Sequence, residues 1–121
     1  NGYDGLFVDI SSKGSKIEYD EKNKTFELTS NTEVSDLIKY AMEGGYDFAA
    51  LAGIPGLVGS GVVGNSSFTA SGKSFSDFVS EMMLYDFENL YFCKNLSNKK
   101  LFGKCIHYIH NLYNRKNYIF L

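Results

Sequence analysis

The stretch L-A-G-I-P-G-L-V-G-S-G-V-V-G-N-S-S, residues Leu51–Ser67, differs from the rest of the chain in its content of glycine and other small residues. Pro55 fixes a backbone angle that suits the first turn of a helix, while Gly53 and Gly56 on either side allow tight turns and close approach by a ligand. Free backbone N–H groups at such a helix start, together with the helix dipole, bind anions such as a diphosphate. The composition therefore indicates either an anionic cofactor site or a helix that packs closely on a sheet.

Three short runs before this segment have the pattern of strands. The apolar run Gly5–Ile10 follows a turn at Asn1–Gly5, which predicts a strand entering a sheet. Residues 16–20 and 25–29 both alternate between apolar and polar, and they flank the polar turn 21–24. This arrangement predicts a hairpin with one face toward solvent.

Between the hairpin and the glycine-rich stretch the apolar residues recur at helical intervals. Ser30 and Glu33 have capping-box spacing, and Gly44-Gly45 supplies a stop signal. We therefore predict an amphipathic helix over about residues 32–43.

The second half of the chain has weaker patterns. Phe78–Tyr85 predicts a strand that ends near residue 86, and Leu90–Cys93 is a candidate to pair with it. Phe102–Tyr113 fits either a helix or a poorly patterned strand and turn, and Asn117–Leu121 predicts a strand. Strands precede and follow helices without regular alternation, so the predicted fold class is α+β in a single domain of 121 residues.

Charge and apolar content argue against several classes of partner. The net charge is −2 and the 12 Lys and Arg residues are scattered, which disfavours nucleic acid as a partner. The longest apolar stretch, Phe48–Val63, is interrupted by glycines and is too short to span a bilayer. With no signal peptide and only two cysteines, Cys93 and Cys105, we expect reduced thiols and a cytoplasmic location.

Cysteine and histidine residues near the C-terminal end could suggest a metal site. Cys105, His107 and His110 lie close together in the sequence, with Cys93 as a fourth candidate ligand. Their spacing matches no zinc pattern, and histidines beside apolar residues are more often packed or hydrogen-bonded. We therefore predict no metal.

The order of residues in the glycine-rich stretch resembles a known flavin-binding signature. Ala52–Gly59, followed by Ser60–Asn65, is similar to A-G-I-P-G-T-V-G-G-A-V, two variable positions and N-A-G, the usual form in UDP-N-acetylenolpyruvoylglucosamine reductases. Asn1–Leu6 resembles the family's D-G-F-x-G-L turn, and Ser76–Val79 resembles its I-x-D-x-V segment. The resemblance covers about residues 1–90, whereas the tail 91–121 diverges.

This resemblance implies the larger subdomain of the FAD-binding fold shared with vanillyl-alcohol oxidase relatives. It implies a UDP-N-acetylmuramate dehydrogenase of peptidoglycan synthesis, in which NADPH reduces FAD and the flavin reduces the enolpyruvyl group of a UDP-linked amino sugar. Backbone groups in the signature would contact the FAD diphosphate and flavin, and two further residues would close the pocket. The signature residues are Gly53, Ile54, Pro55, Gly56, Val58, Gly59, Ser60 and Gly61, and the closing residues are Asn65 and Ser66.

The resemblance also implies a partial enzyme. A first FAD subdomain would precede residue 1 and a substrate domain would follow residue 121, so we expect this truncated FAD-binding domain to be inactive alone. Within the tail, Arg115 stands where the family places a Tyr-Arg-x-Ser motif, and its guanidinium could stabilise an enolate-like charge beside the flavin.

Two other interpretations remain open. The chain could belong to another FAD-linked oxidoreductase of the same fold, because a fold does not fix a substrate. It could also be a degenerate, non-catalytic remnant, since Ser60 and Gly61 stand where the family has Gly-Ala and Ser67 stands where it has glycine. Neither the oligomeric state nor the affinity for FAD follows from the sequence.

Overall fold

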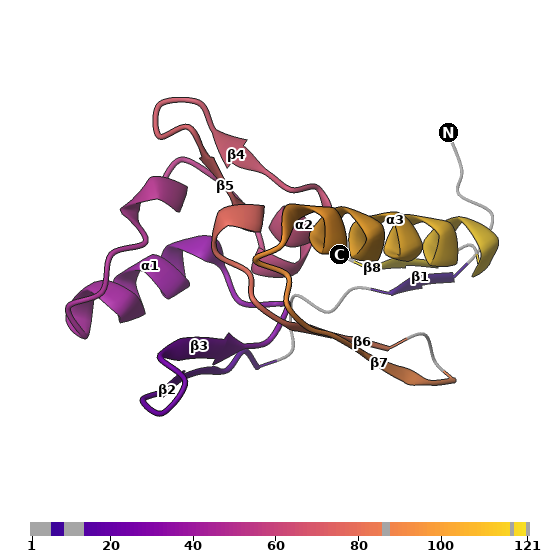
Figure 1. Cartoon of the computed structure of the whole chain (residues 1–121), viewed down its shortest axis with the longest axis horizontal. Coiled ribbons are helices and arrows are strands. Elements are labelled where there is room, and N and C mark those ends of the chain that lie inside the picture. The colour runs from indigo at the N-terminus through magenta and orange to yellow at the C-terminus, as the bar shows by residue number, and fades with distance from the viewer. Residues whose placement is uncertain (1–5, 9–13, 86–87, 117, 121) are drawn as a thin grey trace. The chain divides into compact units, whose positions relative to one another are not determined.

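The structure is a computed structural model that describes residues 6–8, 14–85, 88–116 and 118–120 (Figure 1). The chain divides into two compact units. The first, which we call the glycine-segment unit, comprises residues 14–75; the second, the long-helix unit, comprises residues 6–8 and the described residues from 76 to 120. Both contain helices and small antiparallel strand pairs, which confirms the α+β class.

The predicted hairpin is present in the glycine-segment unit. Strands β2 (Ile17–Asp20) and β3 (Thr25–Leu28) are antiparallel, with Tyr19 opposite Phe26. Asp20 closes the turn, because its carboxylate accepts hydrogen bonds from the Lys22 N–H at 3.0 Å and the Asn23 N–H at 3.2 Å. Asp20, the last residue of β2, therefore stabilises the turn that follows it.

Helix α1 (Val34–Glu43) confirms the predicted amphipathic helix, and its end has the expected glycine stop. Gly45 has a φ of +84°, the Gly45 N–H donates to Met42 O, and the Tyr46 N–H donates to Ala41 O. These two bonds form a Schellman motif that satisfies the last carbonyls of the helix. The buried residues of α1 are spaced by three and four positions: Val34, Leu37 and Ala41.

The predicted capping box at the start of α1 is wrong. The residue before the first turn is Glu33 rather than Ser30, and no side chain caps the helix. Instead, the Val34 N–H donates to the backbone carbonyl of Gly56 at 3.0 Å. A carbonyl of the glycine-rich stretch thus takes the role that the sequence pattern assigned to a hydroxyl.

The glycine-rich stretch runs from the end of one short helix, through a second, to the start of a small strand pair. It follows the 3₁₀ helix η1 (Ala49–Leu51), contains α2 (Val58–Val63), and leads into the antiparallel strands β4 (Ser67–Phe68) and β5 (Lys73–Ser74). Pro55 precedes α2 by three positions, so the prediction that it occupies the first helical turn is wrong. Buried residues of this unit outside α1 include Leu51, Ile54, Val58 and Phe75.

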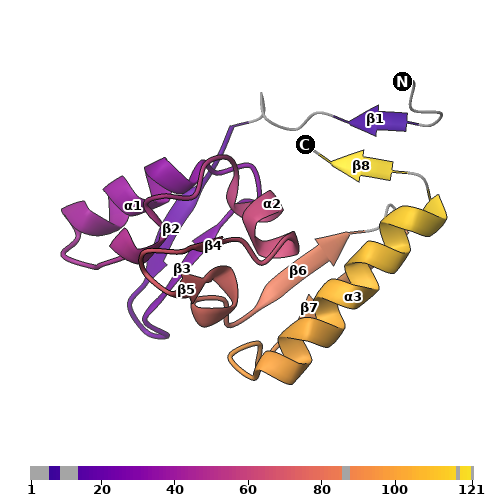
Figure 2. The same cartoon turned by 90° about the horizontal axis from the view of Figure 1, so that it is seen from above.

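The strands of the long-helix unit form two pairs (Figure 2). Strands β6 (Met82–Tyr85) and β7 (Leu90–Cys93) are antiparallel, as predicted, whereas β1 (Leu6–Val8) and β8 (Tyr118–Phe120) are parallel. The strand predicted from Phe78 begins only at Met82, since the 3₁₀ helix η2 (Phe75–Asp77) and a turn come first. The turn expected at Asn1–Gly5 lies outside the described residues.

Helix α3 (Lys99–Lys116) settles the open alternative for residues 102–113 in favour of a helix. Asn98 caps its start, because the Asn98 side-chain oxygen accepts from the Lys100 N–H at 3.0 Å and the Leu101 N–H at 3.3 Å. The buried residues of this unit include Leu96, Phe102, Cys105 and Ile109. Among the described residues, no helix has both the length and the apolar content needed to cross a bilayer.

Candidate functional site

The glycine-rich stretch packs along residues 30–34 through backbone hydrogen bonds. The Val58 N–H donates to Thr32 O at 2.8 Å, and the Gly59 N–H donates to Ser30 O at 2.8 Å. Val58 and Gly59 are the first two residues of α2. The expectation of free N–H groups at this helix start is therefore wrong for both residues, because backbone carbonyls already occupy them.

Backbone N–H groups without a hydrogen bond lie in the loop that precedes α2. Within the described part of the chain, the N–H groups of Gly53, Gly56 and Leu57 make no hydrogen bond. Gly53 and Gly56 are exposed and Leu57 is half-buried. Gly56 and Leu57 are successive residues of this loop, residues 53–57, and successive backbone donors in a turn can hold an anion.

Gly56 is the glycine that the loop conformation requires. Its φ is +91°, a backbone angle that L residues rarely adopt. A Cβ atom there would meet nothing closer than Ser60 Oγ at 3.9 Å, so the space over Gly56 is open. A flat or charged group could approach this backbone closely.

Two other glycines of the signature have a packing role. A Cβ atom at Gly59 would lie 2.7 Å from Ser30 Cβ and 3.0 Å from Ser30 O. A Cβ atom at Gly61 would lie 2.4 Å from the ring of Phe75. The distances of 2.7 and 2.4 Å are too short for a side chain, so these glycines let α2 lie against residue 30 and the Phe75 ring.

Asn65 and Ser66 end α2. Asn65 has a φ of +45°, and its N–H donates to Val62 O at 3.0 Å, while the Ser66 N–H donates to Gly61 O at 2.8 Å. This is a second Schellman motif, with asparagine in the left-handed position that glycine usually takes. Helix termination accounts for the backbone conformation of both residues.

The predicted contact residues differ in their access to solvent. Ile54 and Val58 are buried and belong to the core of the unit, as does Gly61. Gly59 and Ser66 are half-buried. The exposed members are Gly53, Pro55, Gly56, Ser60 and Asn65. The Ser60 hydroxyl donates to Leu57 O at 2.9 Å, which fixes this side chain beside the loop.

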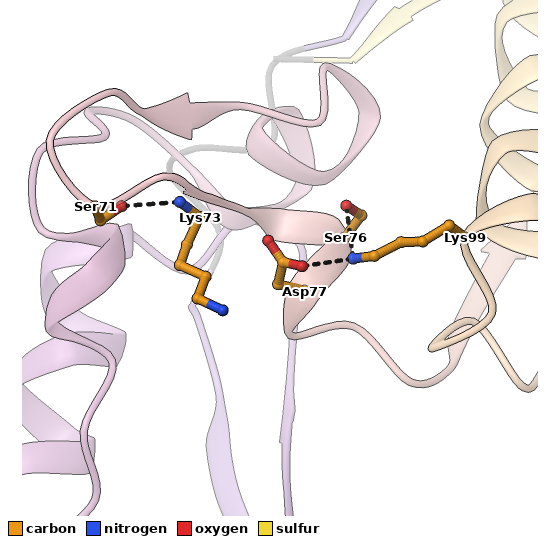
Figure 3. Close-up of polar contacts among 5 residues, drawn as sticks. All are labelled: Ser71, Lys73, Ser76, Asp77 and Lys99. Carbon is orange, nitrogen blue, oxygen red and sulfur yellow. Dashed lines mark hydrogen bonds and ion pairs between the residues drawn. The ribbon is translucent and has the colours of Figure 1, made fainter.

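Sequence reasoning missed the residues that fix the stretch in place. Thr32 is fully buried, and its carbonyl accepts the hydrogen bond from Val58. The Thr32 hydroxyl oxygen lies 3.3 Å from the Thr29 hydroxyl oxygen, within hydrogen-bonding distance. The turn between β4 and β5 is held to η1 in a similar way, because the Ser71 hydroxyl donates to Ala50 O at 2.9 Å and accepts from the Lys73 N–H (Figure 3). No periodicity or motif marks these positions.

In the long-helix unit, the first turn of α3 is tied to η2. Lys99 Nζ donates to Asp77 Oδ1 at 2.7 Å and to Ser76 Oγ at 3.1 Å (Figure 3). A lysine at a helix N-terminus opposes the helix dipole, and the carboxylate of Asp77 offsets that charge. Asp77 belongs to the segment that resembles the family's I-x-D-x-V, and here it forms an ion pair with the divergent tail.

The remaining sequence candidates also lie in this unit. Arg115 is within α3, and its side chain lies outside the described part. Cys93 and Cys105 are free thiols with Sγ atoms 2.6 Å apart, and burial, together with this contact, raises the pKa of Cys105 to about 12. The described residues include His107 and His110. No three potential metal ligands lie together among the described residues.

Comparison of the chain with protein-family models, with curated proteins and with solved structures found no match.

Proposed function

We propose that this chain is the FAD-binding part of a UDP-N-acetylenolpyruvoylglucosamine reductase. Its support is the ordered signature Ala52–Asn65 and the local structure of residues 53–57. When bound, FAD would carry hydride from NADPH to the enolpyruvyl group of a UDP-linked amino sugar. The chain's own contribution is to hold the cofactor.

The single observation that carries the proposal is the open loop before α2. The N–H groups of Gly53, Gly56 and Leu57 are unused among the described residues, and a Cβ atom at Gly56 would meet nothing closer than Ser60 Oγ at 3.9 Å. A diphosphate needs such donors, and a backbone without side chains lets it come within hydrogen-bonding distance. We therefore assign the diphosphate contacts to residues 53–57.

The rest of the signature has a supporting role in this proposal. Gly59 and Gly61 let α2 pack closely, and Asn65 and Ser66 end that helix. The Ser60 hydroxyl, at the exposed side of α2, remains a candidate contact because it stands beside the loop. This division separates residues that touch the cofactor from residues that shape its site.

The direct test is FAD retention by the 121-residue chain. The purified chain is mixed with FAD, passed over a desalting column and examined by visible absorption, with circular dichroism as the check of folding. We expect a flavin band to travel with the folded chain. A folded chain that elutes without flavin would support the alternative in which these glycines serve packing alone.

A pair of matched variants makes the test specific for the loop. Gly56→Val and Gly45→Val both place a side chain on a residue with positive φ, +91° and +84°, so they bear similar backbone strain. We expect Gly56→Val to lose flavin and Gly45→Val to keep it. Equal flavin retention by the two variants would remove residues 53–57 from the site.

A further inference from the structure

A shallow aromatic hollow lies at the end of α1, on the side of the glycine-segment unit formed by the hairpin. It has a volume of about 290 Å³ and is lined by Tyr19, Phe26, Tyr40, Glu43, Gly44 and Tyr46. None of these residues belongs to the flavin signature. We refer to the pocket that these six residues line as the aromatic hollow.

The rings of the hollow form a continuous cluster. The ring centroids of Tyr19 and Tyr46 are 4.7 Å apart, and those of Tyr19 and Phe26 are 5.0 Å apart. Phe26 meets Tyr40 and Tyr46 edge-on, at 6.0 and 5.5 Å. Tyr40 and Tyr46 are each 41% exposed, so part of this aromatic surface is open to a ligand.

The charge at the hollow favours a cation. Glu43 is the last residue of α1 and is exposed, and no described residue forms an ion pair with it. The last turn of α1 contains no basic residue, so the negative end of the helix dipole is not offset there. Aromatic faces also attract cations, because the ring quadrupole is negative above the ring plane.

Hydrogen-bonding capacity separates the classes of cation. Hydrogen bonding with the Tyr46 side chain is the main cause that raises the pKa of Tyr19 to about 12. A primary ammonium group has three N–H donors that lose hydrogen bonds to water against an aromatic face, whereas a quaternary ammonium has no N–H donor to leave unpaired. A metal ion would need more oxygen or nitrogen ligands than the one carboxylate supplies, and no described group of ligands surrounds it.

We propose that the aromatic hollow binds an organic quaternary ammonium group of the trimethylammonium class. Its methyl groups contact the rings, and its charge is balanced by the Glu43 carboxylate and the end of α1. This site is independent of the flavin proposal, because it uses no residue of the loop 53–57.

The test is a titration of the full chain with choline chloride at constant ionic strength, followed by NMR of the tyrosine ring signals. The neutral isostere 3,3-dimethylbutan-1-ol serves as the matched probe, since it replaces only the charged nitrogen with carbon. We expect saturable shifts of Tyr19, Tyr40 and Tyr46, with choline bound about tenfold more tightly than the alcohol. Equal affinities, or shifts that do not saturate, would overturn the proposal.

Variants at exposed positions identify the groups responsible. We expect Tyr40→Ala to weaken choline binding about tenfold, Tyr40→Phe to retain it within about threefold, and Glu43→Gln to weaken it about fivefold. Glu27→Gln, an exposed carboxylate on β3 that does not line the hollow, is the control and should bind as the original chain does. Unchanged binding in both Tyr40→Ala and Glu43→Gln would contradict the assignment.

Discussion

The two halves of the glycine-rich stretch use glycine for different physical reasons. In the loop 53–57, Gly56 has a φ of +91° and faces open space, and nearby N–H groups are unused among the described residues. In α2, Gly59 and Gly61 have no room for a Cβ atom, and the N–H groups of Val58 and Gly59 are bonded to residues 30–32. The stretch therefore combines an open, strained backbone in its first half with close packing in its second.

The largest loss of stability should come from a substitution in the packed half, α2. Gly61→Ala places a Cβ atom 2.4 Å from the Phe75 ring, so we expect a loss of about 2–3 kcal/mol in the free energy of unfolding. Urea denaturation followed by circular dichroism measures this loss. The control is Gly64→Ala, where a Cβ atom would be 3.4 Å from its nearest neighbour, Ser60 O. If the two variants lose equal stability, the packing role of Gly61 is wrong.

A substitution in the open half, the loop 53–57, should lower the free energy of unfolding by less. Gly56→Ala meets no close neighbour, and its cost is the strained backbone angle alone, about 1–2 kcal/mol. The same denaturation experiment applies, without flavin. A loss as large as that of Gly61→Ala would show that Gly56 is packed and would end the distinction between the halves.

Replacing a glycine that has neither a positive φ nor a close neighbour should raise the stability. Gly103 lies in the interior of α3, has no atom within 4 Å of a Cβ position and has no positive φ. Gly103→Ala should therefore raise the free energy of unfolding by up to about 1 kcal/mol through helix propensity. A destabilised Gly103→Ala variant in thermal denaturation would count against this account of α3.

The smallest effect is expected at the end of α2. Asn65 has the left-handed backbone conformation, with a φ of +45°, that glycine adopts without strain. Asn65→Gly and Asn65→Ala both remove the Asn65 side chain, and the alanine variant should be less stable than the glycine variant by about 1 kcal/mol, the cost of the left-handed backbone angle. Thermal denaturation of the two variants distinguishes them, and equal stability would argue against a terminating role for Asn65.

Local patterns predicted the elements of the fold better than their ends. The hairpin and α1 followed from alternation and from the spacing of Val34, Leu37 and Ala41, because these patterns reflect burial within one element. The start of α1 did not follow, since its first N–H bonds to Gly56 O, which is distant in the sequence. The strand prediction for residues 78–81 is also wrong, because the sequence pattern does not reveal the turn after η2.

The candidate site was predicted in part. Composition indicated either a ligand loop or close packing. The structure shows close packing at Gly59 and Gly61 and an open backbone at Gly56. The partners of Gly59 and Gly61 are Ser30 and Phe75, and no local pattern connects them. The bonded N–H groups at Val58 and Gly59 were missed because sequence does not show which carbonyls lie opposite a helix start. The contact of FAD with this stretch stays a prediction.

The most direct test of the central claim is an amide NMR titration of the folded chain with FAD. The claim is that the diphosphate binds the loop 53–57 and not the start of α2. We expect the amide signals of Gly53, Gly56 and Leu57 to shift downfield as their free N–H groups gain an acceptor, with smaller changes at Val58 and Gly59, which are already bonded. Saturable binding that shifts Val58 and Gly59 while the loop amides stay fixed would contradict the account, as would the absence of any shift.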